Sequence, residues 1–190
     1  AFVVFLAAGT QSKAAVNMGV KQTGAGSSYV DLAWNAQLGA GHYHTQFSQD
    51  GKNWIDMEYS SSPSDSVYNL TQGASYYARV VAYNGSHYSG THVMVGVSET
   101  AIVSTKPTEV TGLTQTAAGV NSVSMSWNAS AGAASYVIYG YINYNWTQIG
   151  TSATNSATIT GVAATTSTKF SVAAVKNVTG GTVTGDQCSG

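Results

Sequence analysis

Four histidines are the residues of this chain best suited to binding a metal ion. His42 and His44 are two positions apart, so an extended segment would place both on one face. His87 and His92 follow where a loop and the start of another strand are expected. Imidazole is a common zinc ligand, which makes His42, His44 and His87 the metal candidates. Histidines flanked by tyrosines near loops are usually solvated surface residues, however, and we predict no resident metal and no cofactor.

Aromatic residues form a second group that could bind a ligand. Tyr141, Tyr144 and Trp146 cluster in the second half of the chain, and Trp54 occupies the corresponding place in the first half. Exposed aromatic rings present flat apolar faces with polar tips, which suits contact with glycans. The same residues could instead cover the edge of a sheet, and this is the interpretation that we favour.

The charged residues argue against an enzyme and against a nucleic-acid partner. Only 8% of the residues are charged and the net charge is −1, whereas about 25% are charged in ordinary soluble domains. We expect no close pair of carboxylates that could divide acid and base roles. Seven scattered Lys and Arg residues offer no cluster for phosphates. This polar, weakly charged composition indicates a non-catalytic extracellular or cell-surface protein.

An internal repeat divides the chain. Trp34-Asn35-Ala36 returns as Trp127-Asn128-Ala129 after 93 residues, and Trp54 corresponds to Trp146 after 92. A period near 90 residues is the length of a domain, not of a solenoid unit. We therefore predict an N-terminal apolar extension over residues 1–13, a first module over 14–105 and a second over 106–190. Pro107 lies at the expected hinge.

Both halves show the pattern of half-buried strands. Val30, Leu32 and Trp34 alternate with smaller or polar residues, as do Val123, Met125 and Trp127 in the second half. Turn signals such as Asp50-Gly51 separate the apolar runs, and no stretch has a convincing helical period. The pattern predicts an all-β protein with two β-sandwiches.

The two halves resemble fibronectin type III modules. The resemblance is carried by the early tryptophans and by a signature at the turn between the fifth and sixth strands. The matching residues are Trp34, Leu70, Tyr76, Arg79, Val80, Ala82 and Asn84 in the first half, and Trp127, Val162, Val172 and Ala174 in the second. Thr168 replaces the tyrosine of this signature in the second half. The resemblance implies immunoglobulin-like sandwiches in which strands C, F and G share a sheet, similar to modules of bacterial surface or secreted proteins.

The two ends of the chain suggest assembly. The final segment, residues 184–189, is polar and contains the single cysteine, Cys188, so it predicts a weak last strand. The first eight residues are apolar on both faces of a strand, with Phe2, Val3, Val4, Phe5 and Leu6 as the candidates for partner binding. An apolar strand inserted into the deficient module of a neighbour would build a filament. The alternative is pairing within its own module.

Two functions are therefore expected. In the first, the chain is a non-catalytic subunit or segment of a bacterial surface filament or other assembly, and its partners are copies of itself or other surface proteins. In the second, it supplies carbohydrate-binding or spacer modules to a secreted polysaccharide-degrading enzyme or adhesin, with glycan as the partner. No apolar run approaches the roughly 20 residues of a membrane-spanning helix.

Overall fold

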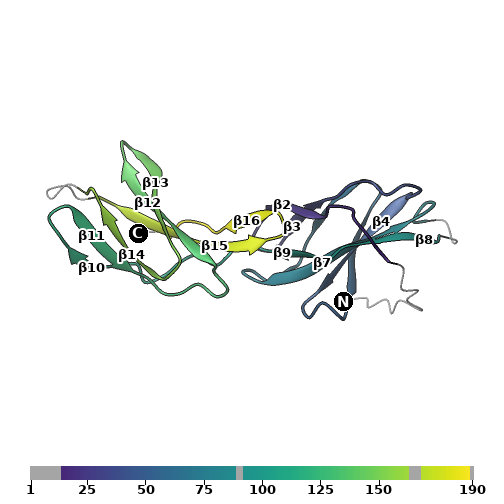
Figure 1. Ribbon diagram of the computed structural model, residues 1–190, viewed down its shortest axis with the longest axis horizontal. Helices are drawn as coiled ribbons and strands as arrows, with labels where there is room; N and C mark the ends of the chain where they lie inside the picture. Colours follow the sequence, from purple (N-terminus) through teal and green to yellow (C-terminus); the bar gives the residue numbers. More distant parts are fainter. Residues whose placement is uncertain (1–13, 89–91, 163–167, 189–190) are drawn as a thin grey trace. The chain divides into compact units, whose positions relative to one another are not determined.

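A computed structural model describes residues 14–88, 92–162 and 168–188, and all of their regular secondary structure is β-strand (Figure 1). These residues divide into two compact units. The first unit consists mainly of residues before Lys106, and the second consists mainly of residues from Lys106 onward. No described segment forms an apolar helix long enough to cross a membrane.

The first unit contains two facing sheets. The smaller sheet has the strand order β2-β3-β6, with β2 at Lys21–Ala25, β3 at Val30–Ala33 and β6 at Ser64–Val67. The larger sheet has the order β1-β8-β7-β4-β5, and β9 pairs with the other end of β7. Its strands are β1 (Ala15–Val16), β4 (His42–Ser48), β5 (Ile55–Ser60), β7 (Ser75–Tyr83), β8 (Met94–Ser98) and β9 (Ala101–Ser104).

The second unit repeats this plan. Its smaller sheet has the order β10-β11-β14, with β10 at Thr114–Ala118, β11 at Ser122–Ser126 and β14 at Ser156–Thr160. The larger sheet has the order β13-β12-β15-β16. Its strands are β12 (Ser135–Ile142), β13 (Asn145–Ser152), β15 (Phe170–Val178) and β16 (Gly181–Thr184).

The strand order confirms the predicted fold class. In each unit a sheet of three strands faces a larger sheet. The larger sheet contains the third, fourth, sixth and seventh strands of the module as neighbours. Strands C, F and G therefore share a sheet, as the resemblance implies. The chain is a tandem of two β-sandwiches whose strand order is that of fibronectin type III modules. The apolar N-terminal strand, with Phe2, Val3, Val4, Phe5 and Leu6, lies outside the described residues.

The internal repeat is reproduced in the packing of the two cores. Trp34 meets Tyr43 edge-on with ring centroids 5.4 Å apart, and Trp127 meets Tyr136 at 5.3 Å with the same interplanar angle of 67°. All four side chains are buried. Each tyrosine hydroxyl also accepts a backbone N–H six residues earlier in the chain, at 3.1 Å in the first unit and 3.0 Å in the second. The aromatic pair therefore joins the two sheets in the same way in both units.

The predicted weakness of the last strand in the second unit is wrong. The β16 strand pairs with β15, and the chain beyond it continues this pairing, because Gly185 donates its N–H to Ala174 and Cys188 donates its N–H to Val172. Cys188 is 6% exposed and belongs to the core that contains Trp127. The sequence did not predict this pairing, because the final segment is polar and only one of its side chains, that of Cys188, enters the core. The position of the last strand in the second unit is thus occupied by the unit's own chain.

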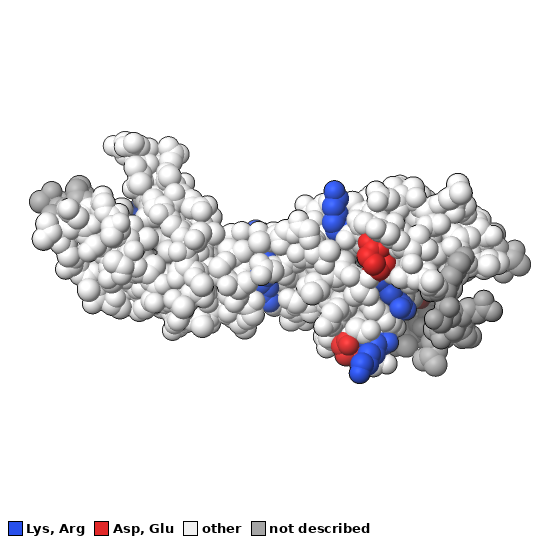
Figure 2. All heavy atoms as spheres, viewed as in Figure 1, with Lys and Arg blue, Asp and Glu red and all other residues white. Residues whose placement is uncertain are grey.

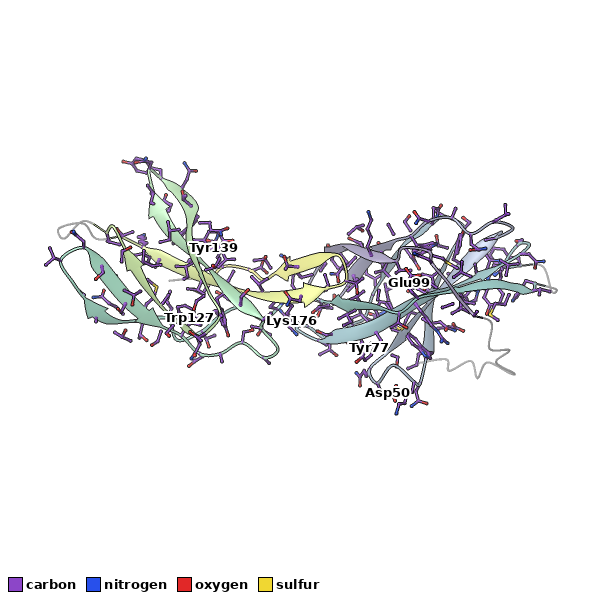
Figure 3. All side chains as sticks on the ribbon, viewed as in Figure 1. Asp50, Tyr77, Glu99, Trp127, Tyr139 and Lys176 are labelled. Carbon is purple, nitrogen blue, oxygen red and sulfur yellow. The ribbon has the colours of Figure 1, made fainter. Side chains whose placement is uncertain are left out.

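A half-buried carboxylate holds the beginning of the first unit in place. Glu99, labelled in Figure 3, lies between β8 and β9 and accepts the backbone N–H groups of Met18 and Val20, both at 2.9 Å. Burial opposes ionisation of this carboxyl, but the backbone donors outweigh it and hold the pKa of Glu99 below its ordinary value. The ionised form therefore stabilises the folded unit.

We predict that the two units unfold independently. Trp34→Ala removes the aromatic core of the first unit and should lower its free energy of unfolding by about 3–5 kcal/mol. The thermal transition of the second unit should not change, and Trp127→Ala should give the converse result in calorimetry. Loss of both transitions together in either variant would show that the units share one core.

We also predict that Glu99→Gln destabilises the first unit at pH 7 by about 1–2 kcal/mol, because a neutral amide replaces a charged acceptor of two N–H groups. A lowered pKa means that the stabilisation is present above the unfolded-state pKa and is lost as the pH falls through the folded-state value. Melting curves of the variant and the original protein should therefore converge in acid. Glu109→Gln, at an exposed carboxyl of the second unit, should leave the first transition unchanged at every pH.

Candidate functional site

The histidine candidates lie on the outer face of the larger sheet in the first unit. Along β4 the side chains of Tyr43 and Phe47 enter the core, so the alternating positions His42 and His44 face outward. His42 is paired across the sheet with Tyr83 on β7, and His44 is paired with a tyrosine on β5. His87 approaches from the connection between β7 and β8. The topology thus brings three imidazoles from two chain segments to one place.

One ring nitrogen from each of His42, His44 and His87 lies within 4.8 Å of the other two. The Nδ1 atom of His87 is 3.3 Å from the Nε2 atom of His44. His42 is 1% exposed, and the other two imidazoles are half-buried. The expectation that these residues are solvated at the surface is therefore wrong for His42. Its ring packs against those of Tyr83, His87 and His92, which come from later parts of the sequence.

The orientation of His42 is fixed by the backbone of the β7–β8 connection. Its Nδ1 atom lies 3.0 Å from the carbonyl oxygen of Gly85. This approach requires glycine at position 41, since a Cβ there would collide with the same carbonyl group. A carbonyl only accepts, so Nδ1 carries the proton and Nε2 has a free lone pair. That Nε2 atom is buried and has no hydrogen-bond partner among the described residues.

Stacked tyrosines hold the other faces of the imidazoles. The ring of Tyr59 lies parallel to that of His87 with 4.1 Å between centroids, and Tyr83 lies parallel to His42 at 5.3 Å. The hydroxyl groups of Tyr59 and Tyr88 are hydrogen-bonded at 2.7 Å. His92 adds a fourth ring, with its centroid 5.1 Å from that of His42. These contacts restrict the rotation of the imidazoles.

The electrostatic environment of His44 favours its neutral form. Burial lowers the pKa of His44, the carboxylate of Asp56 opposes this effect, and the nearby rings of His42, His87 and His92 lower the pKa further. A neutral ring keeps a lone pair on one nitrogen, which is the form that binds metals.

A row of polar contacts continues along the same sheet face and holds Trp54. Gln46 donates to Asp56 at 2.7 Å and accepts from the Nε of Arg79, also at 2.7 Å. The Arg79 guanidinium lies 4.1 Å from the centroid of the Trp54 ring, a cation–π contact. Trp54, one of the four glycan candidates, thus has one ring face covered by this arginine.

The other three glycan candidates lie at the exposed tip of the β12–β13 hairpin. Tyr144 is 90% exposed, Trp146 is 42% exposed and Tyr141 is 40% exposed. The rings of Tyr141 and Trp146 pack edge-on with centroids 5.3 Å apart. The hairpin extends away from the other strands of its unit (Figure 1) and carries no charged residue, so it is white in Figure 2.

A groove at the same end of the second unit begins beside Trp146. It has a volume of about 390 Å³ and is open to solvent on one side. Its walls are mostly apolar and come from both sheets: Leu113, Val123, Met125, Trp146 and Phe170, with Thr114, Gln115 and Lys169 at polar positions. Trp146 therefore contributes to the wall of the groove while part of its ring faces solvent.

One carboxylate of the first unit, Asp65, influences the ionisation of another, Glu58. Burial raises the pKa of Glu58 on β5, and the charge of Asp65 on β6 raises it further. Asp65 is half-buried, and burial raises its pKa although Ser66 and Thr45 donate hydrogen bonds to it. The two carboxylates belong to different sheets, so sequence spacing did not indicate their proximity.

Comparison with known proteins gives one sequence relative and several similar structures. Chitinase A1 of Niallia circulans is 33% identical over 162 residues, which are 81% of this chain and 22% of the chitinase. This chain thus spans about a fifth of the length of that enzyme. No protein-family model matches the chain.

The similar structures contain tandem fibronectin type III domains. A two-domain segment of chicken tenascin has a TM-score of 0.44 at 17% identity and covers 90% of this chain and 95% of its own. The FN1–FN3 domains of chicken CNTN1 have a TM-score of 0.48 at 16% identity and cover 92% and 65%.

We predict that Glu58→Gln stabilises the first unit at pH 7 by about 0.3–0.5 kcal/mol, a small effect because Glu58 is exposed to solvent. A raised pKa in the folded state means that stability is greatest below the unfolded-state pKa and falls as the pH rises through the folded value. The variant should therefore have a higher melting temperature than the original protein at pH 7 and the same melting temperature near pH 3. An equal gain at both pH values would show that the ionisation of Glu58 is not the cause.

Proposed function

We propose that this chain supplies non-catalytic modules to a secreted enzyme that degrades an insoluble polysaccharide, and that the β12–β13 hairpin touches the polysaccharide. The observation that carries this proposal is an uncharged, exposed aromatic hairpin in a chain that is 33% identical to a chitinase. Chitin is therefore the polymer of choice for testing it.

The chemistry of the hairpin supports contact with a neutral polymer. Tyr141, Tyr144 and Trp146 present ring faces and polar tips, which can stack on sugar rings and bond their hydroxyl groups. Because the hairpin itself carries no charged side chain, contact with its rings would require no charge of the hairpin to be desolvated. The adjacent apolar groove gives room for a polymer chain to lie beside Trp146.

The filament interpretation receives less support than this proposal. It depended on a second module without a complete last strand, but β16 and the segment ending at Cys188 occupy that position. The edge of β15 that a donor strand would fill is thus already paired with the chain's own last segment. The role of residues 1–8 as a donor strand stays a prediction.

We predict that the chain is retained on insoluble chitin and that retention depends on the hairpin. Tyr144→Ala and Trp146→Ala should each weaken binding about tenfold, which corresponds to about 1.4 kcal/mol. Tyr144→Ala should not lower the melting temperature, because its side chain is almost fully exposed. Depletion of the protein from solution by increasing amounts of chitin measures the affinity.

Tyr68→Ala is the matched control, since Tyr68 is an exposed tyrosine of the first unit. It should leave retention unchanged. If the original chain stays in solution, or if the control weakens retention as much as the hairpin variants, the hairpin does not bind chitin and the modules would act only as spacers.

A further inference from the structure

The imidazole cluster of the first unit has a geometry that aromatic packing alone does not account for. We propose that His42, His44 and His87 bind one divalent transition-metal ion, and that zinc is the ion that fits the three nitrogens best. This site is independent of the aromatic hairpin, which belongs to the other unit.

The spacing of the nitrogens agrees with shared coordination. Zinc–nitrogen bonds of about 2.0–2.1 Å place two ligands of a tetrahedral site about 3.3 Å apart. His44 Nε2 and His87 Nδ1 are already 3.3 Å apart, and the three donor nitrogens lie within 4.8 Å of one another. Small side-chain rotations would bring the third nitrogen to the same distance.

His42 provides the strongest evidence for a ligand. A buried ring nitrogen without a hydrogen bond costs free energy, and such atoms are rare in folded proteins. The Nε2 atom of His42 is such an atom among the described residues, and it belongs to a residue that is 1% exposed. A metal ion would satisfy this lone pair, together with those of His44 and His87.

A group that would orient His42 as a metal ligand is also in place. Histidines that bind metals usually donate their other N–H to a carbonyl or carboxylate, which fixes the ring and its tautomer. The Gly85 carbonyl does this for His42 at 3.0 Å, and the glycine at position 41 permits the approach. The loop that carries His87 is closed at its base, where the backbone N–H of Asn84 donates to the carbonyl of Val93 and the side chain of Asn84 accepts from the N–H of Val93.

The donor set identifies the class of ion. Imidazole suits zinc, copper and nickel, whereas magnesium and calcium require oxygen ligands. Three protein ligands leave a fourth position of a tetrahedral zinc site to water or to another side chain. The bound ion would join β4 to the β7–β8 connection and should stabilise the first unit in proportion to its affinity.

The test is a titration of the full chain with zinc alone, after treatment with a chelator. Calorimetry should show one zinc per chain with a micromolar or lower dissociation constant. At a hundredfold excess over this constant, the transition of the first unit should rise by about 5 °C or more, and EDTA should reverse the shift. Cobalt in place of zinc should give the visible absorption bands of a four-coordinate ion.

Variants locate the site. His87→Ala and His44→Gln should each reduce zinc affinity at least tenfold, and the use of two positions guards against a variant that does not fold. His92→Ala is the matched control, because it removes a neighbouring imidazole outside the set of three, and it should change affinity only a few-fold. The proposal is overturned if the original chain binds no stoichiometric zinc, if both ligand variants retain its affinity, or if the control loses as much as they do.

Discussion

The edge-on contact between a tryptophan and a tyrosine is the interaction on which each sandwich depends. Trp34 with Tyr43 and Trp127 with Tyr136 connect the two sheets of their units with matching geometry. The chain has a single cysteine and few charged residues, so disulfides within the chain and ion-pair networks cannot supply the stability. Packing must therefore do so, and large aromatic side chains bury the most apolar area per residue. This explains why the tryptophan is the clearest marker of the internal repeat.

The need to pack aromatic side chains in the core also determines which positions of β4 face outward. Since Tyr43 and Phe47 must enter the core from β4, the strand's period of two sends His42 and His44 to the outer face. Side chains on the outer faces do not fill the core, so the residue types there can differ between the two units. The first unit uses this face for imidazoles, and the corresponding positions of β12 are Ser135 and Val137. Repeated cores thus carry different surfaces.

The sequence was sufficient to predict the fold and insufficient to predict the environments of particular side chains. Alternation and the repeat of Trp34 at Trp127 specify strands, faces and module length, because these follow from local periodicity. The burial of His42 depends on Gly85 and Tyr83, which approach it only through tertiary packing. Cys188 likewise appeared to lie in a polar tail, because neither local hydrophobicity nor spacing reveals a chain that fills a core with one side chain. The spacing of His42 and His44 predicts that both lie on one face. Their proximity to His87 depends instead on tertiary packing of the β7–β8 connection.

Trp54 and Trp146 occupy corresponding places in the two units. A single residue difference between the repeats leaves a ring face covered in the first and uncovered in the second. Trp54 is covered on one side by Arg79, which Gln46 holds in place. The position that corresponds to Arg79 in the second unit is Ser171, whose short side chain bonds to the carbonyl of Cys188 and cannot reach the hairpin. Trp146 therefore has no guanidinium over its ring and keeps 42% of its surface exposed. An aromatic residue at the same place in the fold thus has one ring face covered by an arginine in the first module and lacks this cover in the second.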